Sequence, residues 1–189
     1  MPLTFANKVT IARILIVPFF ISTVLYYLPE RDYLRFWALG LFMLATITDF
    51  IDGYIARTRH QKTKAGALLD PLADKILLIS AFICLYKISI YFKTVQFPIW
   101  LVVAVISRDV ILLTGCTIIH LVHGELNGQP TFYGKATTFF QVLSIIGLLL
   151  QWPNSIYLWV LTIFFAIIST IDYIKMGIKI LNAGQTLVR

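Results

Sequence analysis

The sequence is poor in charge and in cysteine. Charged residues make up 13% of its 189 residues, whereas soluble domains carry about 25%. So little charge cannot cover a water-facing surface, which excludes a soluble globular domain, a disordered chain and a free-standing nucleic-acid-binding protein. The two cysteines, Cys84 and Cys116, both lie in apolar stretches. They predict neither a disulfide framework nor a zinc site and are interpreted as small buried hydrophobic residues.

Long apolar segments take the place of the missing polar surface. Hydrophobic residues make up 59% of the chain, and the mean hydropathy is +0.83. A membrane-spanning helix needs about 20 mostly apolar residues. The sequence therefore predicts an all-α integral membrane protein with a single transmembrane domain over residues 1–189. Its six transmembrane helices are expected near residues 5–28, 34–57, 66–90, 97–122, 133–151 and 155–176.

The basic residues predict the orientation of these helices, because Lys and Arg concentrate on the cytoplasmic side of membrane proteins. With a cytoplasmic N-terminus, that side holds ten of them: Lys8, Arg13, Arg57, Arg59, Lys62, Lys64, Lys135, Lys175, Lys179 and Arg189. The other side holds four: Arg31, Arg35, Lys87 and Lys93. Both termini are therefore expected in the cytoplasm. The net charge of +7 is explained by topology and anionic lipid headgroups, and no nucleic-acid partner is expected.

Four aspartates lie inside the predicted spans, where ionisable groups are costly and usually functional. Asp49 and Asp52 lie late in the second span, and Asp70 and Asp74 lie early in the third. Intervals of three and four residues put each pair on one face of its helix. Because the two spans form a hairpin, the pairs are expected to oppose each other near the cytoplasmic end. Four carboxylates in one partly desolvated pocket repel, so they take up protons or bind a cation.

A divalent metal ion is the favoured explanation for these acids. Oxygen ligands with no His or Cys nearby suit Mg²⁺ or Mn²⁺, while Ca²⁺ is possible but less suited to phosphate chemistry. The structural alternative is a set of hydrogen bonds or salt bridges to Arg57 and Lys75, but two cations do not require four buried acids. Gly53, Ala56 and Gly66 accompany the acids. They are interpreted either as close helix packing or as space for a flat ligand against the backbone.

Together these residues form a recognisable pattern across both spans. It resembles, without a departure, the signature of the CDP-alcohol phosphatidyltransferases: Asp49-x2-Asp52-Gly53-x2-Ala56-Arg57-x8-Gly66-x3-Asp70-x3-Asp74. Enzymes of that family transfer a phosphatidyl or similar group from a CDP-linked donor to an alcohol and release CMP. The six-span length is similar too, so the resemblance covers nearly the whole chain.

The resemblance implies a role for each signature residue. The metal ions would be bound by Asp49, Asp52, Asp70 and Asp74. Asp74 would also be the general base that takes the proton of the acceptor alcohol. The cytidine-diphosphate pocket would be lined by Asp49, Gly53, Ala56, Arg57 and Gly66. A homodimer is implied as well. No Ser or Cys is placed to form a covalent intermediate, so direct displacement is expected.

Polar clusters outside the signature concern the acceptor. Thr10 and Arg13 lie on a polar stripe at the start of the first span. This stripe is similar to the lipid-substrate site of phosphatidylglycerophosphate synthases, and a snorkelling interfacial anchor is the alternative. Arg108, deep in the fourth span beside Asp109, is either half of a structural ion pair or a cation for an anionic acceptor. Lys135, at the start of the fifth span, is a second such cation.

The acceptor is open between two branches of the family. Members that use glycerol phosphates typically carry Ala-Arg-Glu and Gly-Lys-x-Lys-Thr. This sequence has Ser-Arg-Asp at 107–109 and Gly-Lys-Ala-Thr-Thr at 134–138, which is similar to the cardiolipin synthases, whose acceptor is phosphatidylglycerol. We expect CDP-diacylglycerol and glycerol 3-phosphate as substrates, as for phosphatidylglycerophosphate synthases, with a cardiolipin synthase as the alternative.

A non-enzymatic alternative is a small cation channel or transporter. Transporters are expected to carry helices broken near the middle of the membrane, and often internal repeats. The acids here lie toward one interface instead, beside a basic loop that suits phosphates. We therefore expect a multi-pass enzyme of the bacterial inner membrane, surrounded by membrane lipids, with its active site facing the cytoplasm.

Overall fold

Six α-helices follow one another along the described part of the chain, which contains no strand. The computed structural model describes the backbone of residues 5–58, 64–123 and 132–186, and the side chains of residues 15–48, 75–115, 117 and 132–178. The helices are α1 (Phe5–Leu25), α2 (Tyr33–Thr58), α3 (Lys64–Ser89), α4 (Ile99–His123), α5 (Phe132–Leu149) and α6 (Ser155–Thr186), with one 3-10 turn, η1 (Pro29–Arg31), after α1. The all-α prediction is confirmed.

The helix bounds follow the predicted spans to within two residues, except at two helix ends. The first helix ends at Leu25 because the chain turns through η1, which Pro29 begins. The sixth continues past the predicted Met176 to Thr186. Hydropathy marks the apolar stretch that suits a bilayer, whereas helical hydrogen bonds continue until a residue breaks them.

Two helices of the described chain are long and apolar enough to cross a membrane, at Phe132–Leu149 and Ser155–Ile178. Shorter apolar helical stretches occur at Leu15–Leu25 and Tyr33–Thr48. Length and composition thus support a membrane-embedded chain, and the number of six spans remains a prediction.

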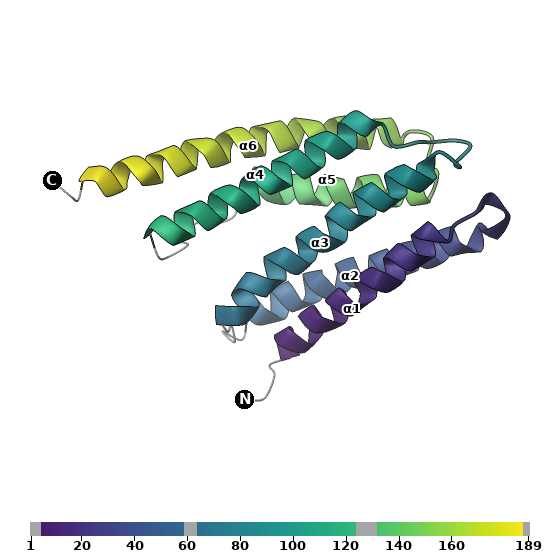
Figure 1. Ribbon diagram of the computed structural model, residues 1–189, viewed down its shortest axis with the longest axis horizontal. Coiled ribbons are helices and arrows are strands. Elements are labelled where there is room, and N and C mark those ends of the chain that lie inside the picture. The colour runs from purple at the N-terminus through teal and green to yellow at the C-terminus, as the bar shows by residue number, and fades with distance from the viewer. Residues whose placement is uncertain (1–4, 59–63, 124–131, 187–189) are drawn as a thin grey trace. The chain divides into compact units, whose positions relative to one another are not determined.

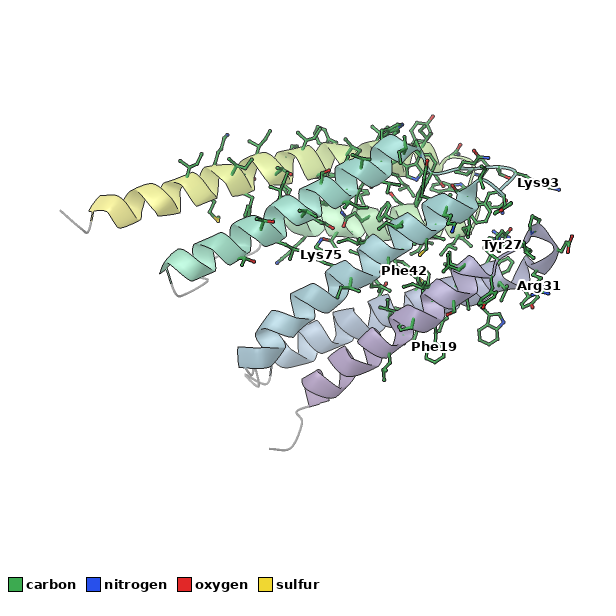
Figure 2. All side chains as sticks on the ribbon, viewed as in Figure 1. Phe19, Tyr27, Arg31, Phe42, Lys75 and Lys93 are labelled. Carbon is green, nitrogen blue, oxygen red and sulfur yellow. The ribbon has the colours of Figure 1, made fainter. Side chains whose placement is uncertain are left out.

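The chain folds into two compact units, of which the first comprises Met1–Phe97 with Leu148–Trp152. In this unit α1 packs against both α2 and α3, and the three helices run in alternating directions (Figure 1). Aromatic side chains fill its centre: the rings of Phe20 and Phe42 lie 5.9 Å apart, and those of Phe82 and Phe97 stack at 5.3 Å. Phe19, by contrast, is 67% exposed and projects away from the other helices of the unit (Figure 2).

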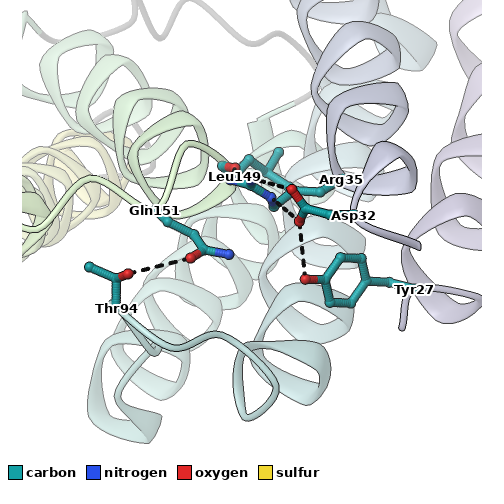
Figure 3. Close-up of polar contacts among 6 residues, drawn as sticks. All are labelled: Tyr27, Asp32, Arg35, Thr94, Leu149 and Gln151. Carbon is teal, nitrogen blue, oxygen red and sulfur yellow. Dashed lines mark hydrogen bonds and ion pairs between the residues drawn. The ribbon is translucent and has the colours of Figure 1, made fainter. Parts of the chain in front are cut away.

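An ion-pair network closes one end of the first unit (Figure 3). Arg35 donates to both carboxylate oxygens of Asp32, from Nε at 2.8 Å and Nη2 at 2.7 Å, and its Nη1 donates to the Leu149 carbonyl at 2.6 Å. The Tyr27 hydroxyl also donates to Asp32. The hydrogen bonds from Arg35 hold the pKa of Asp32 below its ordinary value. The network therefore ties the turn before α2 to the end of α5.

The same end contains a residue with left-handed backbone geometry. Gln151 has a φ of 51°, directly beyond α5, at a place where helices usually end in glycine. Its backbone N–H bonds to the Leu148 carbonyl at 2.8 Å, and its side-chain carbonyl accepts from Thr94 at 3.5 Å (Figure 3). A non-glycine residue in this region is strained.

The second unit comprises Pro98–Gly147 and Pro153–Arg189, and in it α6 packs against α4. Toward α5, Ser144 and Thr162 share a hydrogen bond of 2.9 Å, and the rings of Phe140 and Phe165 stack at 5.1 Å. The approach of these two helices requires Gly147, because a Cβ there would lie 2.8 Å from Ser155 Oγ. Toward α4, α6 makes the contacts of Arg108 described below.

The two faces of α6 have opposite character. Its inner face is buried. It consists of one large aromatic residue, Trp159, and of small or polar residues: Ser155, Thr162, Ala166 and Ser169. Its outer face is exposed and made of large apolar side chains: Ile156, Val160, Phe164, Ile167, Ile171, Ile174 and Ile178. A soluble helix has the reverse pattern, so this distribution supports a lipid environment.

Candidate functional site

The four signature aspartates lie on two helices of the first unit. Asp49 and Asp52 belong to the C-terminal half of α2, and Asp70 and Asp74 to the N-terminal half of α3. Both helices are continuous, so the two Cα atoms within each pair of aspartates lie about one helical turn apart. Figure 1 shows the end of α2 and the start of α3 at the same end of this unit. Their side chains lie outside the described part of the structure.

The other signature residues lie on the same two helix ends. Gly53, Ala56 and Arg57 belong to the last two turns of α2, and Gly66 to the first turn of α3. Residues 59–63, which carry most of the basic loop, are outside the described residues. The predicted helical placement of the signature is therefore confirmed for the backbone, while the contacts of these side chains remain predictions.

The predicted acceptor residues of α1 lie near the same end of the first unit. Thr10 and Arg13 fall in the first half of α1, whose N-terminal end lies at the end of the unit where α2 ends and α3 begins (Figure 1). Their side chains are also outside the described set. Arg31 and Lys93 lie at the opposite end of the unit (Figure 2), which agrees with the predicted division of basic residues between the two sides.

The chemistry of the signature aspartates suits a divalent metal ion. Among the side chains that the structure describes, no group of three or more His, Cys, Asp or Glu could hold a metal ion. The four signature aspartates are not among those side chains. Their carboxylates, on two adjoining helix ends of one unit, are the hard oxygen donors that Mg²⁺ and Mn²⁺ prefer, so the donor set fits such an ion.

Arg108 is a buried cation in the second unit. It lies in α4 with 5% of its side chain exposed, beside a wholly buried Asp109. Its Nη1 donates to Asp109 Oδ1 at 2.7 Å, and its Nη2 donates to Ser169 Oγ on α6 at 2.8 Å. Its Nε has no hydrogen-bond partner among the described residues. The structural ion pair considered from the sequence is thus present, and it leaves part of the guanidinium for a further acceptor.

Lys135 differs from Arg108 in its surroundings. It lies in the first turn of α5 and is exposed. Thr137, which occupies the position of the second lysine in the glycerol-phosphate branch, is wholly buried and donates from Oγ1 to the Tyr133 carbonyl at 2.8 Å. The second unit therefore holds one buried and one exposed candidate for binding an anionic group.

Gln141 is a polar residue of α5 that the sequence analysis missed. Its side chain is wholly buried, and neither Oε1 nor Nε2 has a hydrogen-bond partner among the described residues. The available signal was its position in the middle of an apolar span, where a polar side chain is itself a functional candidate.

Comparison with known proteins places most of the chain in one family. The family model described as CDP-alcohol phosphatidyltransferase matches residues 3–170. A CDP-diacylglycerol--glycerol-3-phosphate 3-phosphatidyltransferase of Aquifex aeolicus is 30% identical, over 93% of this chain and 96% of the relative. A protein of the same name from Bacillus subtilis is 32% identical, over 95% of this chain and 97% of the relative.

Relatives from a second branch match as well. A cardiolipin synthase (CMP-forming) of Streptomyces coelicolor is 34% identical over 72% of this chain and 60% of the relative. A cardiolipin synthase (CMP-forming) of Homo sapiens is 30% identical over 94% of this chain and 63% of the relative. Both branches therefore match most of this chain, and the glycerol-phosphate enzymes match over a larger share of their own length.

Proposed function

Because the chain belongs to the CDP-alcohol phosphatidyltransferase family, we propose that it transfers a phosphatidyl group from CDP-diacylglycerol to glycerol 3-phosphate. The products are phosphatidylglycerophosphate and CMP, an early step of phospholipid biosynthesis. The observation that carries this proposal is the complete eight-position signature on α2 and α3. The near full-length similarity to two enzymes named for this reaction supports the choice of acceptor.

The first unit supplies the residues proposed for the donor. Enzymes of this family depend on a divalent metal ion, and we assign Mg²⁺ or Mn²⁺ to Asp49, Asp52, Asp70 and Asp74. When bound there, such an ion would neutralise charge on the diphosphate and on the departing CMP. The cytidine diphosphate would lie against the residues of the α2 and α3 ends: Asp49, Gly53, Ala56, Arg57 and Gly66. The small residues leave room for the nucleotide, and Arg57 can bind a phosphate through two parallel hydrogen bonds.

Asp74 is proposed as the general base. It takes the proton of the acceptor hydroxyl, whose oxygen then attacks the phosphorus that carries diacylglycerol. The bond from that phosphorus to the oxygen of CMP breaks, and CMP leaves with the electron pair. A carboxylate serves as a general base when it lies within hydrogen-bonding reach of the hydroxyl proton that it takes.

Arg108, Lys135, Thr10 and Arg13 are proposed to bind the acceptor. Glycerol 3-phosphate is small and doubly charged, so cations around its phosphate must supply most of its recognition. Arg108 retains an Nε–H without a described partner, and exposed Lys135 is free to move toward a ligand. The alternative acceptor is phosphatidylglycerol, which the similarity to a cardiolipin synthase keeps in consideration.

We further propose that the chain is a multi-pass protein of the bacterial inner membrane that works as one domain, with its active site facing the cytoplasm. The outer face of α6 and the apolar helices support the membrane location. The family model spans residues of both units, which supports a single functional domain. A homodimer is proposed from the family resemblance alone, and cross-linking in native membranes tests it.

The decisive experiment is a lipid-product assay with the purified full-length protein. CDP-diacylglycerol is supplied with glycerol 3-phosphate or phosphatidylglycerol in turn, and both CMP and the lipid product are measured. CMP release with formation of phosphatidylglycerophosphate is expected. Cardiolipin from phosphatidylglycerol, with no reaction of glycerol 3-phosphate, contradicts the proposed acceptor, and the absence of CMP with any alcohol contradicts the enzymatic function.

A further inference from the structure

The buried amide of Gln141 is a polar group that the fold does not satisfy. It is wholly excluded from solvent, and its carbonyl oxygen and amino group lack hydrogen-bond partners among the described residues. Its helix neighbours on the same face are satisfied: Thr137 donates to a backbone carbonyl, and Ser144 pairs with Thr162. Buried groups without partners are rare and unfavourable. A bound ligand is one group that could satisfy this amide.

The contacts between α5 and α6 define the level at which Gln141 lies. Ser144 pairs with Thr162, and Phe140 stacks on Phe165, so the two helices run antiparallel with Gln141 near the level of Phe165. Thr137, which precedes Gln141 by four residues on α5, lies near the level of Ser169 on α6. Since Arg108 donates to Ser169 at 2.8 Å, its guanidinium lies about one helical turn, roughly 6 Å along the axis, from the level of Gln141.

The two side chains offer complementary chemistry at that spacing. The guanidinium of Arg108 donates to a phosphate, and its Nε–H has no described partner. A glutamine amide both donates and accepts, which matches a hydroxyl group, since a hydroxyl does the same. A molecule that carries a phosphate and a neighbouring hydroxyl on a three-carbon chain has one group to match each of these side chains.

We propose that Gln141 binds the secondary hydroxyl of the glycerol acceptor while Arg108 binds its phosphate. The inference rests on the proposed function and makes Gln141 a specificity residue of the acceptor site. It applies equally to glycerol 3-phosphate and to the headgroup of phosphatidylglycerol, because both carry a primary hydroxyl that reacts and a secondary hydroxyl beside it.

The test compares two acceptors in the wild type and in Gln141→Met, which matches the glutamine in length. One acceptor is glycerol 3-phosphate. The other is 3-hydroxypropyl phosphate, which keeps the primary hydroxyl and the phosphate and lacks only the secondary hydroxyl. The wild type is expected to prefer glycerol 3-phosphate about five- to ten-fold in kcat/KM, the range of one neutral hydrogen bond. Gln141→Met should lose this preference by reacting more slowly with glycerol 3-phosphate alone, with an unchanged KM for CDP-diacylglycerol.

Ser144→Ala is the matched control, since Ser144 lies on the same buried face of α5 and already has a partner. It should keep the wild-type preference between the two acceptors. Gln141→Leu provides a second apolar variant if Gln141→Met is recovered poorly. Equal slowing of both acceptors, or a preference that survives in the Gln141 variants, would overturn the inference and leave the amide a structural group.

The proposed function can fail separately. If the wild type ignores glycerol 3-phosphate, the proposed acceptor is wrong, and the same comparison is made with phosphatidylglycerol and phosphatidyl-1,3-propanediol. If Gln141→Met no longer distinguishes these two lipid acceptors, the contact between Gln141 and the secondary hydroxyl is supported. Retained discrimination with that pair overturns it.

Discussion

A single carboxylate, Asp74, is assigned both to the metal site and to the proton transfer. Asp74→Asn keeps the oxygen and the size of the side chain but removes the base. We expect kcat to fall by about 10²-fold or more, while CDP-diacylglycerol still binds in a metal-dependent way. Turnover and donor binding, measured separately with the purified variant, check this.

Asp49→Asn and Asp70→Asn are the comparison for Asp74→Asn. Both are assigned only to the metal and the donor, so they should weaken donor binding as well as turnover. Excess EDTA should abolish activity of the wild type, and Mg²⁺ or Mn²⁺ should restore it. An Asp74→Asn variant that turned over near the wild-type rate would move the base to another residue.

The two proposed acceptor cations should respond differently to truncation. Lys135 is exposed, so Lys135→Ala should lower kcat/KM for glycerol 3-phosphate roughly ten-fold, the contribution of one charge-assisted hydrogen bond, without a change in thermal stability. Arg108→Ala also removes the partner of a wholly buried carboxylate, so it should lower stability by about 3–5 kcal/mol in addition. Thermal unfolding in detergent and acceptor kinetics separate the two effects.

A double variant shows which loss belongs to the ion pair. Arg108→Ala with Asp109→Ala removes both charges and should recover part of the stability but none of the acceptor affinity. Recovery of both would make Arg108 purely structural.

At this scale the sequence drew attention to the signature residues and missed two polar residues, Ser169, which accepts from Arg108, and the buried Gln141. The acids stand out because charge in an apolar span is rare. Gln141 on the fifth span and Ser169 on the sixth are neutral polar residues, so they do not stand out in a hydropathy profile. Their importance comes from which residues the helices bring together, which spacing along a single helix does not contain.

At the scale of elements, the turn after α5 stores strain at Gln151. Glycine has no Cβ and adopts a φ of 51° without penalty. Gln151→Gly should therefore raise the free energy of unfolding by about 1 kcal/mol, despite losing the 3.5 Å contact to Thr94. Gln151→Ala loses that contact and keeps the strain, so it should be no more stable than the wild type. Equal stability of the Gly and Ala variants would exclude the strain.

The Asp32–Arg35 network should make stability depend on acidic pH. The folded state depresses the pKa of Asp32 through the hydrogen bonds from Arg35, so folding favours the ionised carboxylate. Its contribution is complete above the unfolded pKa, near 4, and is lost as the pH falls from there through the lower folded pKa. Thermal unfolding between pH 7 and pH 3 should show the wild type approaching Asp32→Asn in this window. A constant difference between the two would contradict the assignment.

Helix existence was predictable because each span is a long apolar run bounded by polar or proline-containing turns. The turn that follows the first helix and the extension of α6 were not, since both depend on local hydrogen bonding. The closure of the turn before α2 by Arg35 was also hidden, because its acceptor, the Leu149 carbonyl, is 114 residues away along the chain.

For the whole molecule, the proposed orientation can be tested with single cysteines. In a background with Cys84 and Cys116 replaced by Ala, Glu30→Cys and Asn154→Cys introduce thiols at exposed turns. An impermeant maleimide should label both in intact cells. Lys175→Cys, also exposed, should be labelled only after the membrane is opened. The opposite labelling pattern would place the active site on the outer side.

The two faces of α6 reverse the usual tolerance of a protein to substitution. On the outer face, exchanges among Ile, Val, Leu and Phe meet lipid tails and should leave the protein unchanged. On the inner face, replacement of Ser155 or Thr162 by Val raises the hydropathy of the helix. At Thr162 it removes the hydroxyl that pairs with Ser144. At Ser155 it adds methyl volume where Gly147 lets the helices approach. Variants of this chain ranked by gain in hydrophobicity would therefore be ranked in the wrong order along its last helix.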